Sequence, residues 1–262
     1  MRYETILVED NNHIRCITLN RPLKLNAINY DLIEELSNTI DNCQNNDDIR
    51  VVVLKGAGKC FCAGDDLKGM GTQKNPSLDA HVINRVNMGY PKLLSKIRNL
   101  RKPVLAVVHG YALGAGCDLA LACDMIFATE DSKFGLVFSE RGLVGGTALL
   151  PKLVGYQKAC EILFGGEMFT AVEGKEMGIV NYTSLTYADL ESISNKWASK
   201  YSKSATTALG LMKQALNQSI GETFEKSLEI QKHITVGVYH TQDSVEGKQA
   251  FIEKRDSNFK GK

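Results

Sequence analysis

The stretch His109-Gly110-Tyr111-Ala112-Leu113-Gly114-Ala115-Gly116-Cys117-Asp118 follows the apolar run Pro103–Val108 without a break. A run that is apolar at every position is typical of a strand buried on both faces of a parallel sheet. The glycines after the run predict a turn that leads into a short helix over Cys117–Cys123. This part of the chain therefore indicates a strand–turn–helix unit of an α/β fold.

A similar strand and turn occur earlier in the chain. Val51–Leu54 is again apolar throughout, and it is followed by Gly56-Ala57-Gly58 and then by Cys62-Ala63-Gly64-Asp65-Asp66-Leu67. Glycine permits backbone bends that point consecutive N–H groups into a cavity, and the start of a helix leaves N–H groups free. Two such donors from separate turns would form an oxyanion hole, which stabilises a carbonyl oxygen as it becomes an enolate.

Neither turn fits the common phosphate-binding motifs. Gly114-Ala115-Gly116 lacks the third small residue of a dinucleotide-binding fingerprint, and Gly56-Ala57-Gly58-Lys59 lacks both that residue and a suitably spaced lysine. The sequence also has no serine in either turn, which argues against a serine protease site.

Around these two units, strands alternate with helices. Apolar spacing predicts strands over Glu4–Val8, His13–Leu19 and Met125–Ala128, and helices over Tyr30–Cys43 and Asp79–Leu100, the second interrupted near Pro91. This alternation implies right-handed crossovers and a mainly parallel core.

After Phe134 the chain is expected to be mostly helical. The predicted helices are Thr147–Leu153, Gln157–Leu163, Ala171–Met177, Ala188–Tyr201, Ala205–Gln218, Phe224–Val238 and Ser244–Lys254. The polar, basic tail Arg255–Lys262 is expected to be a solvated end.

Composition narrows the class of protein. The chain has 262 residues and a formal net charge of +1, without the basic stripe that a nucleic-acid partner would require. No signal peptide or membrane-spanning apolar run is predicted, and the seven cysteines are expected to be reduced thiols of a cytoplasmic protein. Cys60 and Cys62 have no second Cys/His pair at ligand spacing, so no metal site is predicted.

Several motifs in fixed order resemble the enoyl-CoA hydratase/isomerase (crotonase) family, over nearly the whole chain. They are Leu19-Asn20-Arg21-Pro22, Lys24-Leu25-Asn26-Ala27, the two glycine turns, Asp131-Ser132-Lys133-Phe134-Gly135, Leu153-Val154-Gly155, Gly178-Ile179-Val180 and Phe251-Ile252-Glu253-Lys254-Arg255. The resemblance implies a spiral of ββα units over residues 1–200 and a C-terminal helical part over 201–262 that serves trimer contacts. It also implies acyl-CoA thioester substrates and a homotrimer or hexamer.

The resemblance carries over to individual residues of the two turns. It implies that the backbone amides of Asp65 and Ala115 form the oxyanion hole, and that Gly64 and Gly114 are substrate-binding residues beside them.

The coenzyme A part of the substrate is expected along the first turn. The Ala63 backbone would face the adenine, Asp66 and Leu67 would line the path, and Lys24 would lie near the phosphates.

The acidic residues depart from the family's pattern. A typical hydratase of this family adds water with two glutamates, one polarising the water and one delivering a proton. The first glutamate position is Asp118 here, and the second is Phe138, whose apolar ring transfers no proton and is assigned to the acyl pocket. The insert between Gly142 and Gly145, which carries an acidic base in some isomerases, is shorter in this chain.

Each remaining candidate has a structural interpretation beside the catalytic one. Asp118 lies in the first turn of a helix, where an acid is favoured by the helix dipole alone. Glu140 is the nearest spare carboxylate and would share the face of Phe138 in an extended segment, but next to Arg141 it also fits a solvated surface pair. His109 ends a buried strand and is assigned a structural role.

The sequence therefore predicts an acyl-CoA enzyme that stabilises a thioester enolate, by hydration or double-bond isomerisation of an enoyl-CoA. Decarboxylation and thioester hydrolysis stay open because the same oxyanion hole would serve them. A catalytically silent CoA-binding subunit is the alternative from another class. No cofactor is predicted, since coenzyme A is part of the substrate.

Overall fold

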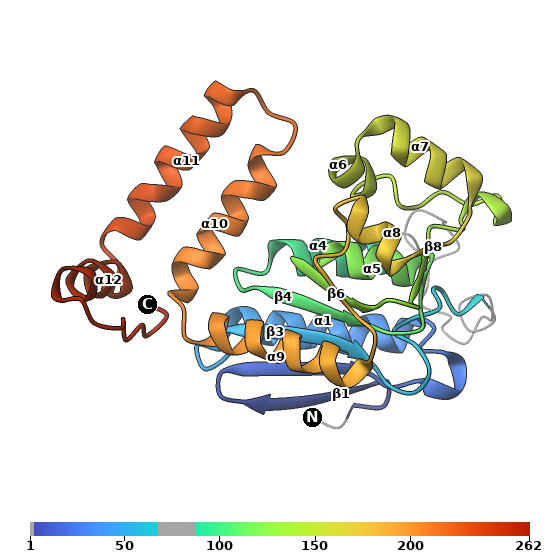
Figure 1. Cartoon of the computed structure of the whole chain (residues 1–262), viewed down its shortest axis with the longest axis horizontal. Coiled ribbons are helices and arrows are strands. Elements are labelled where there is room, and N and C mark those ends of the chain that lie inside the picture. Colours follow the sequence, from blue (N-terminus) through green and yellow to red (C-terminus); the bar gives the residue numbers. More distant parts are fainter. Residues whose placement is uncertain (1–2, 68–86, 88) are drawn as a thin grey trace.

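The computed structural model describes residues 3–67, 87 and 89–262. Its centre is a six-stranded sheet in the order β1-β2-β3-β4-β6-β9 (Figure 1). The strands are β1 (Ile6–Asn11), β2 (Ile14–Leu19), β3 (Val51–Gly56), β4 (Val104–Val108), β6 (Met125–Thr129) and β9 (Tyr182–Ser184). Only the β1–β2 pair is antiparallel within this sheet, so the predicted parallel core is confirmed.

Alternate residues of the central strands face opposite layers, as the two-residue period of a strand requires. Val52 and Leu54 of β3 join the larger core under three helices: α1 (Tyr30–Asn45), α4 (Tyr90–Asn99) and α5 (Ala115–Ala122). Val51 and Val53 face the other layer, where α9 (Tyr187–Ser202) covers the sheet. Both faces of β3 and β4 are thereby buried, which explains their unbroken apolar sequences.

A second, three-stranded sheet lies beside the first turn of α5. It consists of β5 (Tyr111–Leu113), β7 (Lys133–Gly135) and β8 (Phe169–Thr170), with β5 parallel to β7 and β7 antiparallel to β8. Two short helices, α6 (Leu150–Val154) and α7 (Tyr156–Gly165), lie between β7 and β8 in the chain, and α8 (Ala171–Glu176) follows β8. The helix starts are set locally; Thr170 and Glu173, for example, form a reciprocal capping box at the start of α8.

The last three helices form a C-terminal arm, defined here as α10 (Thr206–Ser219), α11 (Phe224–Tyr239) and α12 (Gln242–Glu253). In Figure 1, α10 and α11 form a hairpin that projects from the body of the molecule, and α12 lies near the foot of the hairpin. None of the described helices is long and apolar enough to cross a membrane.

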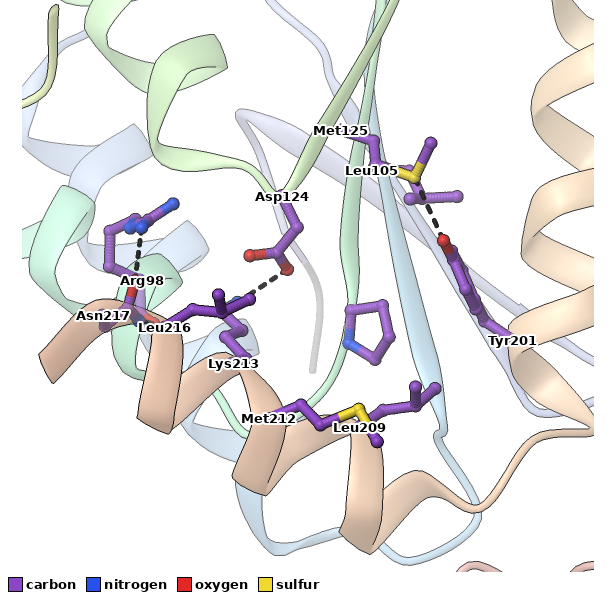
Figure 2. Close-up of a pocket in the computed structure, with 11 residues that line it drawn as sticks. Arg98, Leu105, Asp124, Met125, Tyr201, Leu209, Met212, Lys213, Leu216 and Asn217 are labelled. Carbon is purple, nitrogen blue, oxygen red and sulfur yellow. Dashed lines mark hydrogen bonds and ion pairs between the residues drawn. The ribbon is translucent and has the colours of Figure 1, made fainter. Parts of the chain in front are cut away.

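A buried ion pair joins the arm to the body. The Lys213 ammonium on α10 contacts the Asp124 carboxylate at 2.8 Å (Figure 2). It also donates to the carbonyl oxygens of Ile97 and Lys102. A pocket of about 320 Å³ lies between α10 and the first residues of β4 and β6, with Leu105 and Tyr201 on its wall.

The tail Arg255–Lys262 is mostly solvent-exposed, as expected, but its backbone is also hydrogen-bonded to other parts of the chain. The Asp243 carboxylate at the start of α12 accepts from the backbone N–H groups of Lys260 at 2.6 Å and Gly261 at 2.7 Å. The Arg50 guanidinium donates to the Phe259 carbonyl oxygen at 3.1 Å. These bonds pair two buried side chains, those of Asp243 and Arg50, with backbone groups of the tail, which holds the tail in place.

Candidate active site

The two glycine turns lie side by side, although about fifty residues of sequence separate them. Cys62 and Ala112 form an isolated parallel bridge. The Cys62 N–H donates to the Tyr111 carbonyl oxygen at 2.9 Å, and the Leu113 N–H donates to the Cys62 carbonyl oxygen at 3.0 Å. The bridge brings the ends of two strand–turn units together at one place.

Glycine is required where the turns touch. Gly64 has φ +99°, and a Cβ built on it would lie 2.8 Å from the Leu113 carbonyl oxygen and 3.7 Å from the Ala115 nitrogen. A Cβ on Gly116 would lie 2.5 Å from the Cys62 carbonyl oxygen. Any side chain at either position would therefore push the turns apart.

One buried asparagine holds the first turn in place. The Asn26 amide donates to the carbonyl oxygens of Ala57 and Cys60, each at 2.8 Å, and its oxygen accepts from the Arg21 N–H at 2.9 Å. Asn26 is fully buried and has φ +55°, a left-handed conformation that asparagine tolerates better than most residues.

Several backbone amides at this junction donate no hydrogen bond to any described residue. They include the N–H groups of Asp65, in the first turn, and of Ala115, the first residue of α5. The α5 amides also bear the positive end of the helix dipole. The arrangement is suited to an oxygen that gains negative charge.

Asp118 lies one turn into α5 and is 3% exposed. Its Oδ2 accepts from the Gly146 N–H at 3.0 Å. Burial raises the pKa of the Asp118 carboxyl to about 6; the bonds from Gly146 and the Tyr90 side chain lower it, and the Asp65 charge raises it further. The carboxyl is thus held close to the pH at which it can both take and release a proton.

The Asp65 side chain interacts electrostatically with Asp118. Its Oδ1 is buried and has no hydrogen-bond partner among the described residues. Burial raises the pKa of this carboxyl to about 6. Asp65 therefore contributes an unsatisfied carboxyl as well as the backbone amide that the sequence pointed to.

Tyr90 completes this group of titratable side chains. It is the first residue of α4, and burial raises the pKa of its hydroxyl, with further increases from the charges of Asp118 and Asp65 and from its side-chain bond with Asp118. Sequence reasoning missed Tyr90 because its only local signal is Pro91, which marks a helix start. The two carboxyls and this hydroxyl come from three separate segments.

Phe138 lies against the backbone near Asp118. A Cβ built on Gly145 would come within 2.4 Å of the Phe138 ring, and the ring lies 4.0 Å from a Cβ built on Gly114. The ring is 8% exposed. The ring packs beside the second turn, and its assignment to the acyl pocket stays a prediction.

Glu140 has the surroundings of a surface pair. Ser139–Arg141 is a single 3-10 turn, so the extended segment that would place Glu140 on the face of Phe138 was a wrong expectation. The Glu140 side chain is 58% exposed and pairs with Arg141 at 3.7 Å. The catalytic role of Glu140 stays a prediction, and its ion-pair partner is Arg141 and not a residue of the site.

The predicted CoA-binding residues have varied surroundings. Lys24 and Leu67 are exposed, whereas Ala63 is half-buried and its N–H donates to Leu25. The Asp66 carboxylate is paired with the Arg21 guanidinium at 2.8 Å.

His109 has one bonded and one unbonded ring nitrogen. Nε2 lies 2.9 Å from the Gly58 carbonyl oxygen, while Nδ1 is buried without a partner among the described residues. The ring also packs edge-on against Tyr187. Within the described part of the chain, no three His, Cys, Asp or Glu side chains are grouped as metal ligands.

Comparison with known proteins places this geometry in a family. Residues 9–262 match the family described as "Enoyl-CoA hydratase/isomerase". A protein of Rhizobium meliloti (strain 1021) named "Probable enoyl-CoA hydratase" is 34% identical, over 99% of both chains. The "2,3-dehydroadipyl-CoA hydratase" of Escherichia coli (strain K12) is 33% identical, over 98% of this chain and 99% of that protein.

A solved structure agrees with the sequence matches. The crystal structure of an enoyl-CoA hydratase from Bacillus anthracis superimposes with a TM-score of 0.91 at 34% identity, covering 99% of this chain and 100% of that chain. The predicted crotonase-type fold is thereby confirmed. This chain belongs to the enoyl-CoA hydratase/isomerase family and is an enzyme of that type.

Proposed function

We propose that this enzyme hydrates an enoyl-CoA through a thioester enolate held by the N–H groups of Asp65 and Ala115. The observation that carries the proposal is the position of these two amides, without partners among the described residues, beside the buried carboxyl of Asp118. A single donor of this kind contributes roughly 3–4 kcal/mol to stabilising an oxyanion. Hydration is favoured because the similar E. coli protein is named as a hydratase.

In the proposed reaction, ionised Asp118 takes a proton from water as the water oxygen bonds to Cβ of the enoyl group. The Cα–Cβ double-bond electrons move toward the thioester, and its oxygen takes up negative charge in the oxyanion hole. Protonation of Cα then returns the carbonyl and gives the 3-hydroxyacyl-CoA.

Double-bond isomerisation is the second candidate. The residue that favours it is Phe138, since its apolar ring stands where a typical hydratase has a second glutamate, and one carboxylate can remove and return a single proton. No cofactor enters either scheme, because coenzyme A belongs to the substrate. Within this proposal, CoA follows Ala63–Leu67, with Lys24 near its phosphates.

The proposal is tested by incubating the purified protein with crotonyl-CoA and with a 3-enoyl-CoA, and by identifying the products. We expect 3-hydroxybutyryl-CoA from the first substrate and a fall of about 10²-fold or more in turnover for Asp118→Asn. Tight CoA binding without turnover of either substrate would instead identify a silent binding subunit.

We further propose that the chain assembles as a homotrimer or hexamer through the C-terminal arm. Large apolar side chains are exposed along the arm; they include Met212, Leu216, Phe224, Val236 and Phe251. Isolated exposed apolar residues are ordinary, but their concentration on one projecting unit favours burial against another subunit.

A further inference from the structure

The group formed by Asp65, Asp118 and Tyr90 contains one carboxyl more than the proposed function has used. Asp118 has donors directed at it: the Gly146 N–H on Oδ2 and the Tyr90 side chain. Asp65 Oδ1 has none among the described residues, although the atom is buried. A buried carboxylate without hydrogen-bond donors is costly. Asp65 therefore favours the protonated form and Asp118 favours the ionised form.

We propose that the Asp65 side chain is the second proton-transfer group of this enzyme, and that it delivers its proton to Cα of the thioester enolate. This inference rests on the proposed hydration. It assigns two functions to one residue, because the Asp65 amide binds the thioester oxygen while its carboxyl acts on the adjacent carbon. Although Phe138 occupies the family's second glutamate position, the reaction then still has two carboxyls, those of Asp118 and Asp65.

The proton balance of the scheme closes. Asp118 takes one proton from water while the water oxygen bonds to Cβ, and Asp65 gives one proton to Cα while the enolate electrons form the new C–H bond. Asp118 ends protonated and Asp65 ends ionised. Transfer of one proton from Asp118 to Asp65 restores the starting state, and the Tyr90 hydroxyl interacts with both carboxyls and is bonded to Asp118.

The other groups around the pair leave this division of charge in place. The Cys62 thiol interacts electrostatically with Asp65, and burial raises its pKa to about 12; the Cys117 thiol interacts with Asp118, and burial raises its pKa as well. Both thiols are therefore neutral at physiological pH. Arg21, whose charge acts on the Cys62 thiol, is paired with Asp66 at 2.8 Å.

The test distinguishes the roles of Asp65 and Asp118 by comparing two reactions, hydration of the double bond and hydrogen exchange at Cα. Hydration of crotonyl-CoA requires both groups, whereas exchange of the Cα hydrogens of butyryl-CoA in D₂O requires only the group that works at Cα. We expect Asp65→Asn to lower both rates by about 10²-fold or more, and Asp118→Asn to lower hydration while Cα exchange continues. Both variants keep the backbone N–H of residue 65, so the Kd for butyryl-CoA should change less than threefold.

Two results would overturn the inference while leaving the proposed hydration intact. One is hydration and Cα exchange by Asp65→Asn within twofold of the unmodified enzyme; the other is loss of Cα exchange in Asp118→Asn alone. If the unmodified enzyme hydrates no enoyl-CoA, the proposed function itself fails.

A measurement on the unmodified enzyme keeps the test independent of variant folding. One ionised and one protonated carboxyl predict a bell-shaped pH profile of kcat/KM, with both limbs below pH 9 because Tyr90 titrates above its ordinary value. A profile that rises once and stays flat to pH 9 contradicts a protonated Asp65.

Discussion

At Asp118, the ionised carboxyl that the proposed reaction needs lowers the stability of the folded state. The side chain is 3% exposed, and its carboxyl has few donors to replace the water that it loses on folding. Burial therefore raises the pKa of this carboxyl to about 6, and the ionised form needed to accept a proton from water is held at a cost to the folded state. Replacing it by the neutral, similarly shaped asparagine should remove that cost together with the activity.

The pH dependence of unfolding tests this cost. Between the ordinary pKa of an aspartate, near 4, and about 6, the folded state retains a proton that the unfolded chain has released, so stability falls as pH rises through this window. The unfolding free energy of the unmodified chain should fall between pH 4 and pH 7. We expect this fall to be smaller in Asp118→Asn, by on the order of 2–3 kcal/mol. Urea denaturation at several pH values measures it.

The control for this experiment is Glu34→Gln, which alters an exposed carboxylate on α1. Its unfolding curves should follow those of the unmodified chain. Equal pH dependence in Asp118→Asn and the unmodified chain would contradict a buried carboxyl that ionises at a cost.

At the scale of elements, the long helices and buried strands follow from apolar spacing. The predicted helix Tyr30–Cys43 is α1 (Tyr30–Asn45), and the predicted strand Pro103–Val108 is β4 (Val104–Val108). The three strands of the second sheet were missed because each has two or three residues, too few for a two-residue period to be recognised. Their pairing depends on contacts between segments far apart in the chain.

The candidate site divides in the same way. The role of the Asp65 amide could be predicted because the turn that contains it resembles a family motif. The convergence of the Asp65 carboxyl with Asp118 and Tyr90 could not, since it depends on how α4 packs against α5. The part of Asp79–Leu100 that precedes α4, apart from Asn87 and Gly89, lies outside the described residues.

The attachment of α10 to the body rests on the Lys213–Asp124 pair. Burial lowers the pKa of Lys213 and raises that of Asp124, while their mutual attraction opposes both shifts. Lys213→Met leaves a largely buried carboxylate unpaired, and we expect a loss of about 3–5 kcal/mol in unfolding free energy. Denaturant midpoints measure the loss.

Two further variants sharpen this experiment. Adding Asp124→Asn to Lys213→Met should recover part of the loss, because an amide oxygen still accepts from the Val104 N–H that Asp124 accepts from at 2.8 Å. Lys226→Met breaks an exposed pair on α11 and should change stability by less than about 1 kcal/mol. Similar losses for Lys213→Met and Lys226→Met would rule out a special role for the buried pair.

At the scale of the whole molecule, the C-terminal arm leaves large apolar side chains uncovered by the rest of its own chain. No residue of α11 is buried, and the Phe224 and Phe251 side chains are 76% and 85% exposed. Burying a phenylalanine side chain is favourable by roughly 1.5–3 kcal/mol, which is lost while the arm faces water. Assembly through the arm would recover it.

Light scattering on the purified protein tests this assembly. We expect a mass three or six times that of one chain, and a lower mass for the double variant Phe224→Lys/Phe251→Lys. Leu185→Lys is the matched control, because this leucine is 81% exposed but lies outside the arm. A monomer in the unmodified protein would contradict the proposed assembly.

Asn26 makes the active site sensitive to chemical ageing. Deamidation would replace its NH₂ group by an oxygen, and a carboxylate would then face the carbonyl oxygens of Ala57 and Cys60 that the amide now binds at 2.8 Å. Two attractive contacts would become two repulsive ones around a fully buried side chain. The first glycine turn, which contains Asp65, would no longer be held in its position. Replacing the single NH₂ group of Asn26 would therefore be enough to disrupt the site.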